Sequence, residues 1–162
     1  MDKQLEKTIC SMAGEYLVAA HLSIRGYLVA ITPKGLPGAD LVVHDLRKGR
    51  SALIQVKAFT SKNRHPLIGV SAKFDEVDAV LEERVTYPFV FVQVAEDLTE
   101  AKFYILSPSQ VRRLAKRAYM EWIERGRHRK PVEELKKARQ PLGIPLSELE
   151  RYRDAWDNIW RE

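Results

Sequence analysis

The sequence has very little cysteine, and it has no long run of apolar residues. Its 162 residues include a single cysteine, Cys10, so the chain cannot form an internal disulfide, and a reducing cytoplasm is the expected location. Four of the first seven residues are charged, and no apolar stretch that could serve as a signal peptide or a membrane span is present there. We therefore expect a cytoplasmic protein without a membrane partner.

Motifs for the commonest nucleotide and metal sites are also absent. The loop KGLPGAD contains two glycines but has neither Walker nor Rossmann spacing. The four histidines do not show the spacing of metal ligands; they are His21, His44, His65 and His128. The sequence therefore offers no P-loop and no histidine metal centre.

What is present indicates one globular domain with a hydrophobic core. Hydrophobic residues make up 45% of the chain and charged residues 30%, as in ordinary soluble proteins. The net charge is +5 and the sequence pI is about 9.3, which favours a polyanionic partner only weakly. The position of the positive charge is therefore more informative than its total.

Hydrophobic periodicity predicts a mixed α/β fold with the order α-β-β-β-α-β-β-α-α. Strands are predicted at 27–32, 40–46, 51–59, 88–94 and 101–106, and helices at 4–25, 71–84, 108–125 and from 147 onward. Capping boxes mark two helix starts, Ser107 with Gln110 and Ser147 with Glu150. In the first helix the apolar stripe comprises Leu5, Ile9, Met12, Tyr16, Ala20 and Ile24. We assign residues 1–125 to a core domain and 126–162 to a basic linker with a helical extension packed on it.

The strand SALIQVKAFT carries an amide and a charge on one face. Because strand side chains alternate, Gln55 and Lys57 share a face. With Lys48-Gly49 as a two-residue hairpin turn, the preceding strand would place Asp40 opposite Lys57. A purely structural ion pair is one interpretation of this cluster. The other is a divalent-metal site for phosphodiester hydrolysis, which needs oxygen ligands and a nearby cation.

These residues resemble the PD-(D/E)XK nuclease superfamily, which has the restriction-endonuclease-like core. The resemblance is carried by Asp40, by the sequence Gln-Val-Lys at 55–57, and by Gly14-Glu15 in the first helix. It is strongest to uncharacterised prokaryotic members that also have a tail motif, found here as Tyr152, Asp154, Trp156 and Asp157. Archaeal Holliday-junction resolvases are similar more distantly.

The resemblance implies a catalytic set of Asp40, Gln55, Lys57 and Glu15, with Mg²⁺ or Mn²⁺ as cofactor. Asp40, Gln55 and the Val56 carbonyl would hold the metal, and Lys57 would orient water and stabilise phosphate charge. Two positions depart from the family pattern. Ala39 replaces the usual proline, and Gln55 replaces the usual acidic ligand, so the site has one negative charge fewer.

Positive charge is concentrated between residues 112 and 139, with eleven Lys and Arg against four Glu. The 108–125 helix carries Arg112, Arg113, Lys116 and Arg117 opposite its apolar stripe, and the loops add Lys34, Lys62 and Arg64. A solvated helix face is the plain interpretation. Together with the basic linker, a phosphate-contacting patch is favoured, without base readout.

The sequence therefore predicts a nuclease-like protein that binds nucleic acid, with DNA favoured over RNA, and hydrolyses it with Mg²⁺ or Mn²⁺. The alternative is a catalytically inactive member that serves as a binding or scaffold module, an alternative kept open by Gln55. A third reading is a domain in which Asp40 and Lys57 form only a structural pair. A homodimer is also an open alternative, because relatives that cut duplexes commonly need two sites.

Overall fold

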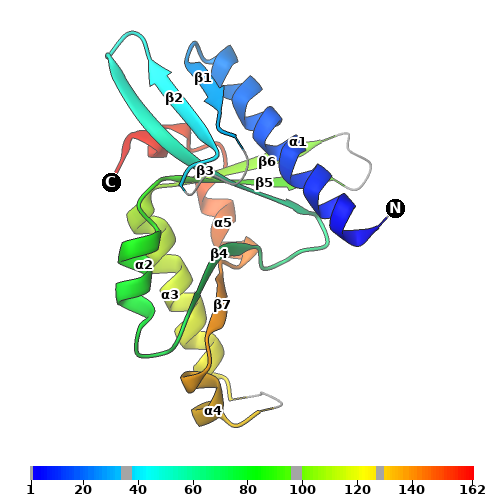
Figure 1. Cartoon of the computed structure of the whole chain (residues 1–162), viewed down its shortest axis with the longest axis vertical. Coiled ribbons are helices and arrows are strands. Elements are labelled where there is room, and N and C mark those ends of the chain that lie inside the picture. The colour runs from blue at the N-terminus through cyan, green and yellow to red at the C-terminus, as the bar shows by residue number, and fades with distance from the viewer. Residues whose placement is uncertain (1, 34–37, 96–99, 127–129) are drawn as a thin grey trace.

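The computed structural model describes residues 2–33, 38–95, 100–126 and 130–162, and it has a mixed α/β architecture (Figure 1). The helices are α1 (Lys3–Ile24), α2 (Val77–Arg84), α3 (Pro108–Glu124), α4 (Val132–Lys137) and α5 (Leu146–Leu149), and two 3₁₀ helices follow at Glu150–Tyr152 and Trp156–Trp160. The strands are β1 (Leu28–Ile31), β2 (Leu41–Asp45), β3 (Arg50–Thr60), β4 (Leu67–Ala72), β5 (Phe89–Val94), β6 (Ala101–Leu106) and β7 (Gln140–Gly143). No helix among the described residues is long and apolar enough to cross a membrane.

A five-stranded mixed sheet with the order β1-β2-β3-β5-β6 forms the centre of the molecule. Strands β1, β2 and β3 are antiparallel, β3 pairs with β5 in parallel, and β5 pairs with β6 antiparallel. All six residues of β5 are buried, as expected for a continuous apolar strand covered on both faces. The predicted α/β class and the five predicted strands are therefore confirmed.

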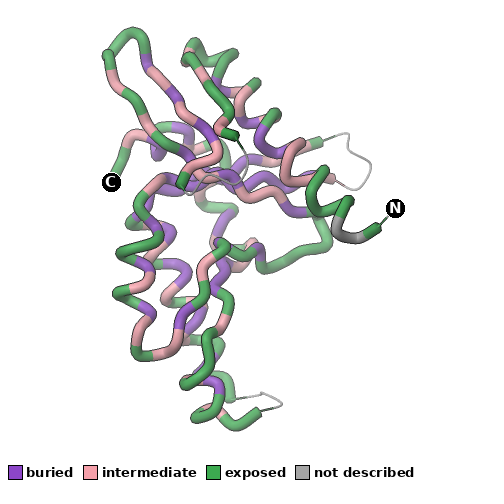
Figure 2. The backbone as a smooth tube through the Cα atoms, in the orientation of Figure 1, coloured by how far each residue is buried: buried purple, intermediate pink, exposed green. Residues whose placement is uncertain are grey.

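Alternate residues of the sheet belong to two separate layers of the hydrophobic core. In Figure 2 buried segments lie on both sides of the sheet. Val90 and Val92 of β5 pack with Val18 and Leu22 of α1, whereas Phe91 packs on the opposite face in the layer formed by α2 and α3. Residues after 125 contribute to both layers. The helical layer includes Leu135, Leu142 and Leu149, and the α1 layer includes Trp156 and Ile159.

A second sheet, formed by β4 and β7, was not predicted from the sequence. Together with α3 and α4 it forms the lower part of the molecule in Figure 1, which we call the lower lobe. The prediction of a helix from residue 71 was wrong at its start, because Ser71 and Ala72 belong to β4 and α2 begins only at Val77. The short helix α4 (Val132–Lys137) was likewise absent from the predicted order of elements. Each short strand depends on a partner about 70 residues away in the chain, which local periodicity does not reveal.

The two predicted capping boxes had different outcomes. The box before α3 is confirmed, since the backbone N–H of Gln110 donates to Ser107 Oγ and the backbone N–H of Ser107 donates to Gln110 Oε1 at 2.9 Å. The box at Ser147 was wrong, because α5 begins at Leu146 and makes a single turn. The backbone then turns at Asp154, which has a φ of 53° and donates its N–H to the Phe103 carbonyl at 2.9 Å. Pairing of the tail with β6 therefore replaces the predicted last helix.

Helix α1 faces the sheet with the side opposite to its predicted apolar stripe. Val18 and Leu22 are fully buried, whereas Tyr16 and Ile24 in the stripe are 58% and 83% exposed. The buried side also contains Gly14, where an ideal Cβ would lie 2.6 Å from the Cβ of Ala58 on β3. The absence of a side chain at residue 14 lets this face approach the sheet closely, and this steric requirement determines the orientation more than hydrophobicity does.

Candidate active site

The hairpin that carries the candidate site has a longer turn than predicted. Asp45 pairs with Arg50 and Leu41 pairs with Ile54, so residues 46–49 form a four-residue turn. The predicted pairing of Asp40 with Lys57 was therefore wrong by two residues. Continuing the observed register places Asp40 opposite Gln55. Because the shift is an even number of residues, Asp40, Gln55 and Lys57 still share one face of the sheet.

The carboxylate of Asp40 is held by its neighbours on β3. Its Oδ2 accepts a hydrogen bond from the amide Nε2 of Gln55 and another from the backbone N–H of Val56, at 2.7 Å for the latter. The backbone is fixed as well, because the Asp40 N–H donates to Ile54 O and the Asp40 carbonyl accepts from the Thr32 N–H, both at 2.9 Å. Both side-chain bonds use Oδ2, so Oδ1 takes no part in either of them.

The backbone of Val56 points into the same space. The Gln55 N–H donates to Pro88 O at 3.0 Å, so Gln55 is bonded towards β5. Successive residues of a strand direct their backbone groups to alternate sides, and Val56 therefore directs its N–H and C=O away from β5. The bond from its N–H to Asp40 agrees with that direction. The Val56 carbonyl consequently lies on the side of the sheet edge where β2 has left β3.

Lys57 is half-buried beside these groups. Burial lowers the pKa of its ammonium group from the usual value, and the negative charges of Asp40 and Glu15 offset part of that shift. Gly69 of β4 provides room for the side chain, because an ideal Cβ at residue 69 would lie 3.2 Å from Lys57 Nζ. Gly69 has a φ of 80°, a backbone conformation that other residues adopt only at a cost.

Helix α1 adds a second carboxylate to the cluster. Glu15 is only 8% exposed, its Oε1 accepts a hydrogen bond from Ser11 Oγ at 3.4 Å, and its charge acts on Lys57. Ser11 lies one turn before Glu15 and Lys7 lies two turns before it. Both line a cleft together with Asp40, Gln55 and Lys57. The close approach of Gly14 to β3 positions this side of the helix next to Lys57.

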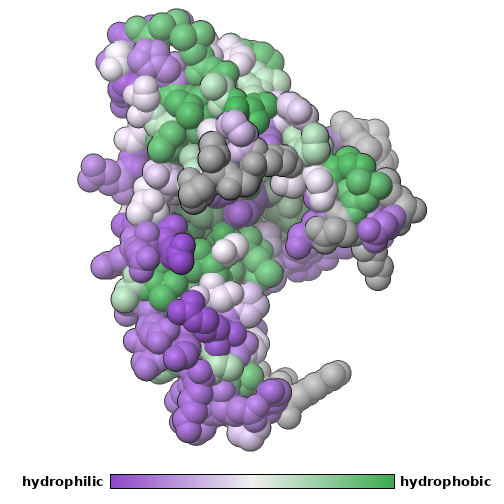
Figure 3. Space-filling view, viewed as in Figure 1, coloured by the Kyte–Doolittle hydropathy of each residue, from purple (hydrophilic) through white to green (hydrophobic). Residues whose placement is uncertain are grey.

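The resulting cleft has a volume of about 410 Å³. Its walls come from α1, from the edge of β3, and from the loop and strand that follow β3, with Asn63, Pro66 and Leu67 among the lining residues. In Figure 3 the surface is hollowed between the part of the molecule that carries α1 and the lower lobe. Among the described residues, no three His, Cys, Asp or Glu side chains form a group that could hold a metal ion. A metal in this cleft would therefore depend on amide and backbone oxygens as well as carboxylates.

The predicted basic residues lie in two places. Lys62 and Arg64 are exposed in the loop after β3, next to the cleft residue Asn63, and Lys34 lies outside the described residues. The four basic residues of α3 have partners within the chain. Lys116 and Arg117 form ion pairs of 2.6 Å with Asp78 and Glu148, Arg112 donates to the Val85 carbonyl at 2.7 Å, and Arg113 donates to Tyr152 Oη at 3.0 Å.

The tail motif contributes to packing at a different place. The Trp156 ring stacks on His21 of α1 with centroids 5.9 Å apart, and Arg25 lies over it at 4.5 Å. Trp156 is buried against Phe103 of β6, whereas Asp154 and Asp157 are exposed. Trp156 of the tail motif is therefore a core residue that ties the tail to α1 and β6.

Sequence reasoning missed Lys7 and Gly69 as parts of the cleft. Lys7, Ser11 and Glu15 are spaced by four residues, a helical repeat that could have grouped them on one side of α1. Gly69 gave no such signal, because its role depends on a strand whose partner was not predicted.

No family model and no curated protein matches this chain. Among solved structures, it is similar to a bacterial homing endonuclease, with a TM-score of 0.43 and 13% sequence identity, over 92% of this chain and 89% of that one.

Proposed function

We propose that the protein is a metal-dependent nuclease that hydrolyses phosphodiester bonds in the cleft between α1, β3 and β4. The observation that supports this most directly is the grouping of Asp40, Gln55, the Val56 backbone and Lys57 at one sheet edge, with Glu15 acting on Lys57 from α1. These residues are separated by up to 42 positions in the chain, and they include oxygen donors and a cation within one solvent-accessible space.

The donor set fits Mg²⁺ or Mn²⁺. Both ions prefer oxygen ligands, and Mg²⁺ commonly binds through one or two carboxylates while it keeps several waters. Asp40 would contribute its carboxylate and Val56 its carbonyl, and Gln55 would contribute Oε1 if its amide turned away from Asp40. An ion held there would supply Lewis acidity and positive charge for the scissile phosphate.

Lys57 has the environment that the chemistry requires. Its lowered pKa follows mainly from burial, and burial also strengthens the interaction of its charge with a nearby phosphate oxygen. Its ammonium can donate hydrogen bonds to the attacking water and to the phosphate. Hydrolysis forms one P–O bond from water and breaks another, and the leaving oxygen takes up a proton.

We further propose that the substrate is nucleic acid, with DNA favoured. Lys7 lines the cleft, and the exposed Lys62 and Arg64 flank the lining residue Asn63 in the chain, so their charges suit a phosphate backbone. The α3 residues Arg112, Arg113, Lys116 and Arg117 form the second proposed contact region. A homodimer belongs to this proposal if the substrate is a duplex, since two strands require two cuts.

A specific observation favours the alternative of an inactive binding module. The Gln55 amide donates to Asp40, so the pair is satisfied without a metal, whereas a glutamate in that position would repel Asp40. In that alternative the Gln55–Asp40 bond is a structural element, and the cleft binds nucleic acid without cutting it.

The experiment that separates the two functions is cleavage of a panel of DNA and RNA substrates with Mn²⁺, with Mg²⁺ and with EDTA. The nuclease proposal expects metal-dependent products from the wild type and none from Lys57→Ala. Lys48→Ala, an exposed lysine in the hairpin turn, is the matched control and should cleave normally. Binding without cleavage by all three proteins would support the inactive module instead.

A further inference from the structure

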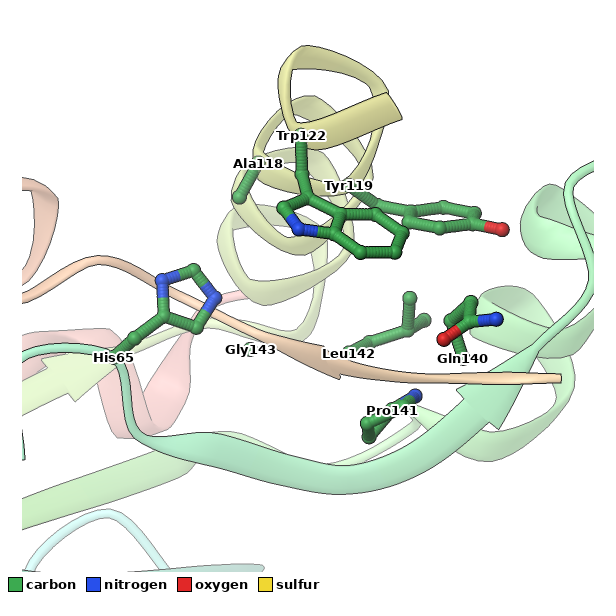
Figure 4. Close-up of a pocket in the computed structure, with 8 residues that line it drawn as sticks. All are labelled: His65, Ala118, Tyr119, Trp122, Gln140, Pro141, Leu142 and Gly143. Carbon is green, nitrogen blue, oxygen red and sulfur yellow. The ribbon is translucent and has the colours of Figure 1, made fainter. Parts of the chain in front are cut away.

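A second cavity lies in the lower lobe, between α3 and β7 (Figure 4). Its volume is about 350 Å³, within the range of small-molecule pockets. Ala118, Tyr119 and Trp122 of α3 form one wall, and residues 140–143 of β7 form the other. His65 stands at one end of the cavity and Gln140 at the other (Figure 4).

The α3 wall is an aromatic platform. The rings of Tyr119 and Trp122 are stacked with centroids 6.1 Å apart and an interplanar angle of 21°. Tyr119 is buried, whereas Trp122 is 37% exposed. The buried tyrosine supports the indole from within the lobe, so the indole is a rigid surface at the cavity. Leu142 and Pro141 lie across from it (Figure 4), which makes the space a slot with apolar walls.

The ends of the slot are polar. Gln140 donates its Nε2 to the Leu135 carbonyl at 3.3 Å, and its amide oxygen lies on the cavity side in Figure 4. His65 is placed by Gly143, since an ideal Cβ at residue 143 would lie 2.6 Å from the imidazole Cδ2. Partial burial, together with the positive charge of Arg125, lowers the pKa of His65 below its usual value and so favours the neutral imidazole.

The cavity adjoins both positive charge and the proposed active site. Arg125 acts electrostatically on His65, and Arg64 precedes it in the chain. The loop that carries His65 also contributes Asn63 and Pro66 to the cleft. Hydrogen bonds from Ile144 N to Pro66 O at 3.1 Å and from Leu146 N to Arg64 O at 2.9 Å hold this loop to the residues after β7. One fixed loop therefore separates the two cavities.

We infer that this slot binds a single nucleobase of a nucleic-acid strand, stacked on Trp122, with its phosphate near Arg125. A planar heteroaromatic base matches the aromatic and apolar walls, and the polar ends can bond its ring nitrogens and exocyclic groups. A purely aliphatic ligand would leave Gln140 and His65 without a role. The inference rests on the proposed function, because it assigns a base-binding subsite to the same nucleic-acid substrate.

The test uses adenosine 5′-monophosphate as the probe and isothermal titration calorimetry of the full chain. The wild type should bind it, and ribose 5-phosphate, which lacks the base, should bind at least about tenfold more weakly. Loss of a base–aromatic stack predicts about tenfold weaker binding for Trp122→Ala, with an intermediate value for Trp122→Phe. Equal affinity for the two probes, or unchanged affinity in Trp122→Ala, would overturn the inference.

A filling variant gives an independent result if Trp122→Ala does not fold. Ala118→Leu adds side-chain volume to the slot and retains both aromatic rings, so it should also weaken binding by at least about tenfold. Ala79→Leu, at an exposed alanine of α2, is the matched control and should bind normally. Lys57→Ala should abolish cleavage but leave adenosine 5′-monophosphate affinity unchanged, which separates failure of the slot from failure of the nuclease proposal. Normal binding by Ala118→Leu would contradict the proposed site.

Discussion

The ammonium of Lys57 occupies space that exists because residue 69 has no side chain. An ideal Cβ on Gly69 would lie 3.2 Å from Lys57 Nζ and 3.5 Å from Cε. Strand β4 belongs to the small second sheet, so the position of Lys57 depends on a part of the molecule that does not carry any other catalytic candidate.

Gly69→Ala should therefore displace Lys57 and lower cleavage at least tenfold, if the cleft is active. The positive φ of residue 69 adds a backbone cost of about 1–2 kcal/mol to folding. Gly49→Ala is the control, because Gly49 also has a positive φ, of 58°, but an added Cβ there would meet nothing within 4 Å. Both variants should lose similar stability in urea unfolding, and only Gly69→Ala should lose activity. Equal activities would mean that Lys57 is not the catalytic lysine.

Gln55→Glu tests whether the Asp40 pair is a metal site. The substitution replaces the donor in the Gln55–Asp40 bond by a second carboxylate, so without metal the protein should become less stable. With Mn²⁺ the added negative charge should raise affinity, and the stability should return. Titration of Mn²⁺ by calorimetry and thermal unfolding with and without metal measure both effects. The control is Gln55→Glu in an Asp40→Asn background, because this double variant has a single carboxylate in the pair, at residue 55. If Mn²⁺ affinity does not rise, there is no metal site at residue 55.

The orientation of α1 predicts opposite outcomes for two apolar residues on one helix. Leu22→Ala should cost about 2–5 kcal/mol of unfolding free energy, because the side chain is fully buried. Ile24→Ala should change stability by no more than about 0.5 kcal/mol, because its side chain is 83% exposed. Urea denaturation of the two variants checks the assignment. Comparable losses would place the apolar stripe against the core after all.

The two basic regions should differ in their effect on the salt dependence of DNA binding. Each phosphate contact on duplex DNA contributes about −0.9 to the slope of log K against log[salt]. Arg64→Ala should reduce the slope by nearly that amount. The α3 residues Lys116 and Arg117 are paired with Asp78 and Glu148, so their joint replacement should have a smaller effect. A larger effect from the α3 pair would identify α3 as the main contact surface.

The main sheet was predictable because its strands are strongly apolar and are bounded by turn residues. The strand at 101–106 was predicted with the bounds that it has, and β5 differs by one residue. The position of Asp40 was harder to predict. Alternation correctly placed it on the face of Gln55 and Lys57, but its partner was wrong because the turn has four residues rather than two. Register depends on turn geometry, which Lys48-Gly49 did not determine.

The parts that failed depend on contacts far apart in the chain. Periodicity correctly predicted a helix for α1 but gave the wrong buried face, since the close contact between Gly14 and Ala58 involves a strand 44 residues later. The basic face of α3 was visible in the sequence, but the ion pairs that it makes were not, because Lys116 and Arg117 find their acidic partners 38 and 31 residues away. The local sequence shows the type and spacing of the residues, but the fold determines which residue each one contacts.

The pairing of β4 with β7 has a consequence for the order in which the molecule is completed. Leu67 pairs with Gly143, and the loop between these strands contains most of the helical layer. Contacts between residues far apart in the chain form late, because closing the long segment between them costs conformational entropy before the contact can stabilise it. During synthesis, β4 would remain without its partner strand until residue 143 has emerged, and Gly69 would not yet be fixed beside Lys57. A growing chain would thus contain the residues of the cleft well before the cleft itself forms. A chain shortened before β7 would keep Asp40 and Lys57, but β4 would lack the partner strand that holds Gly69 beside Lys57.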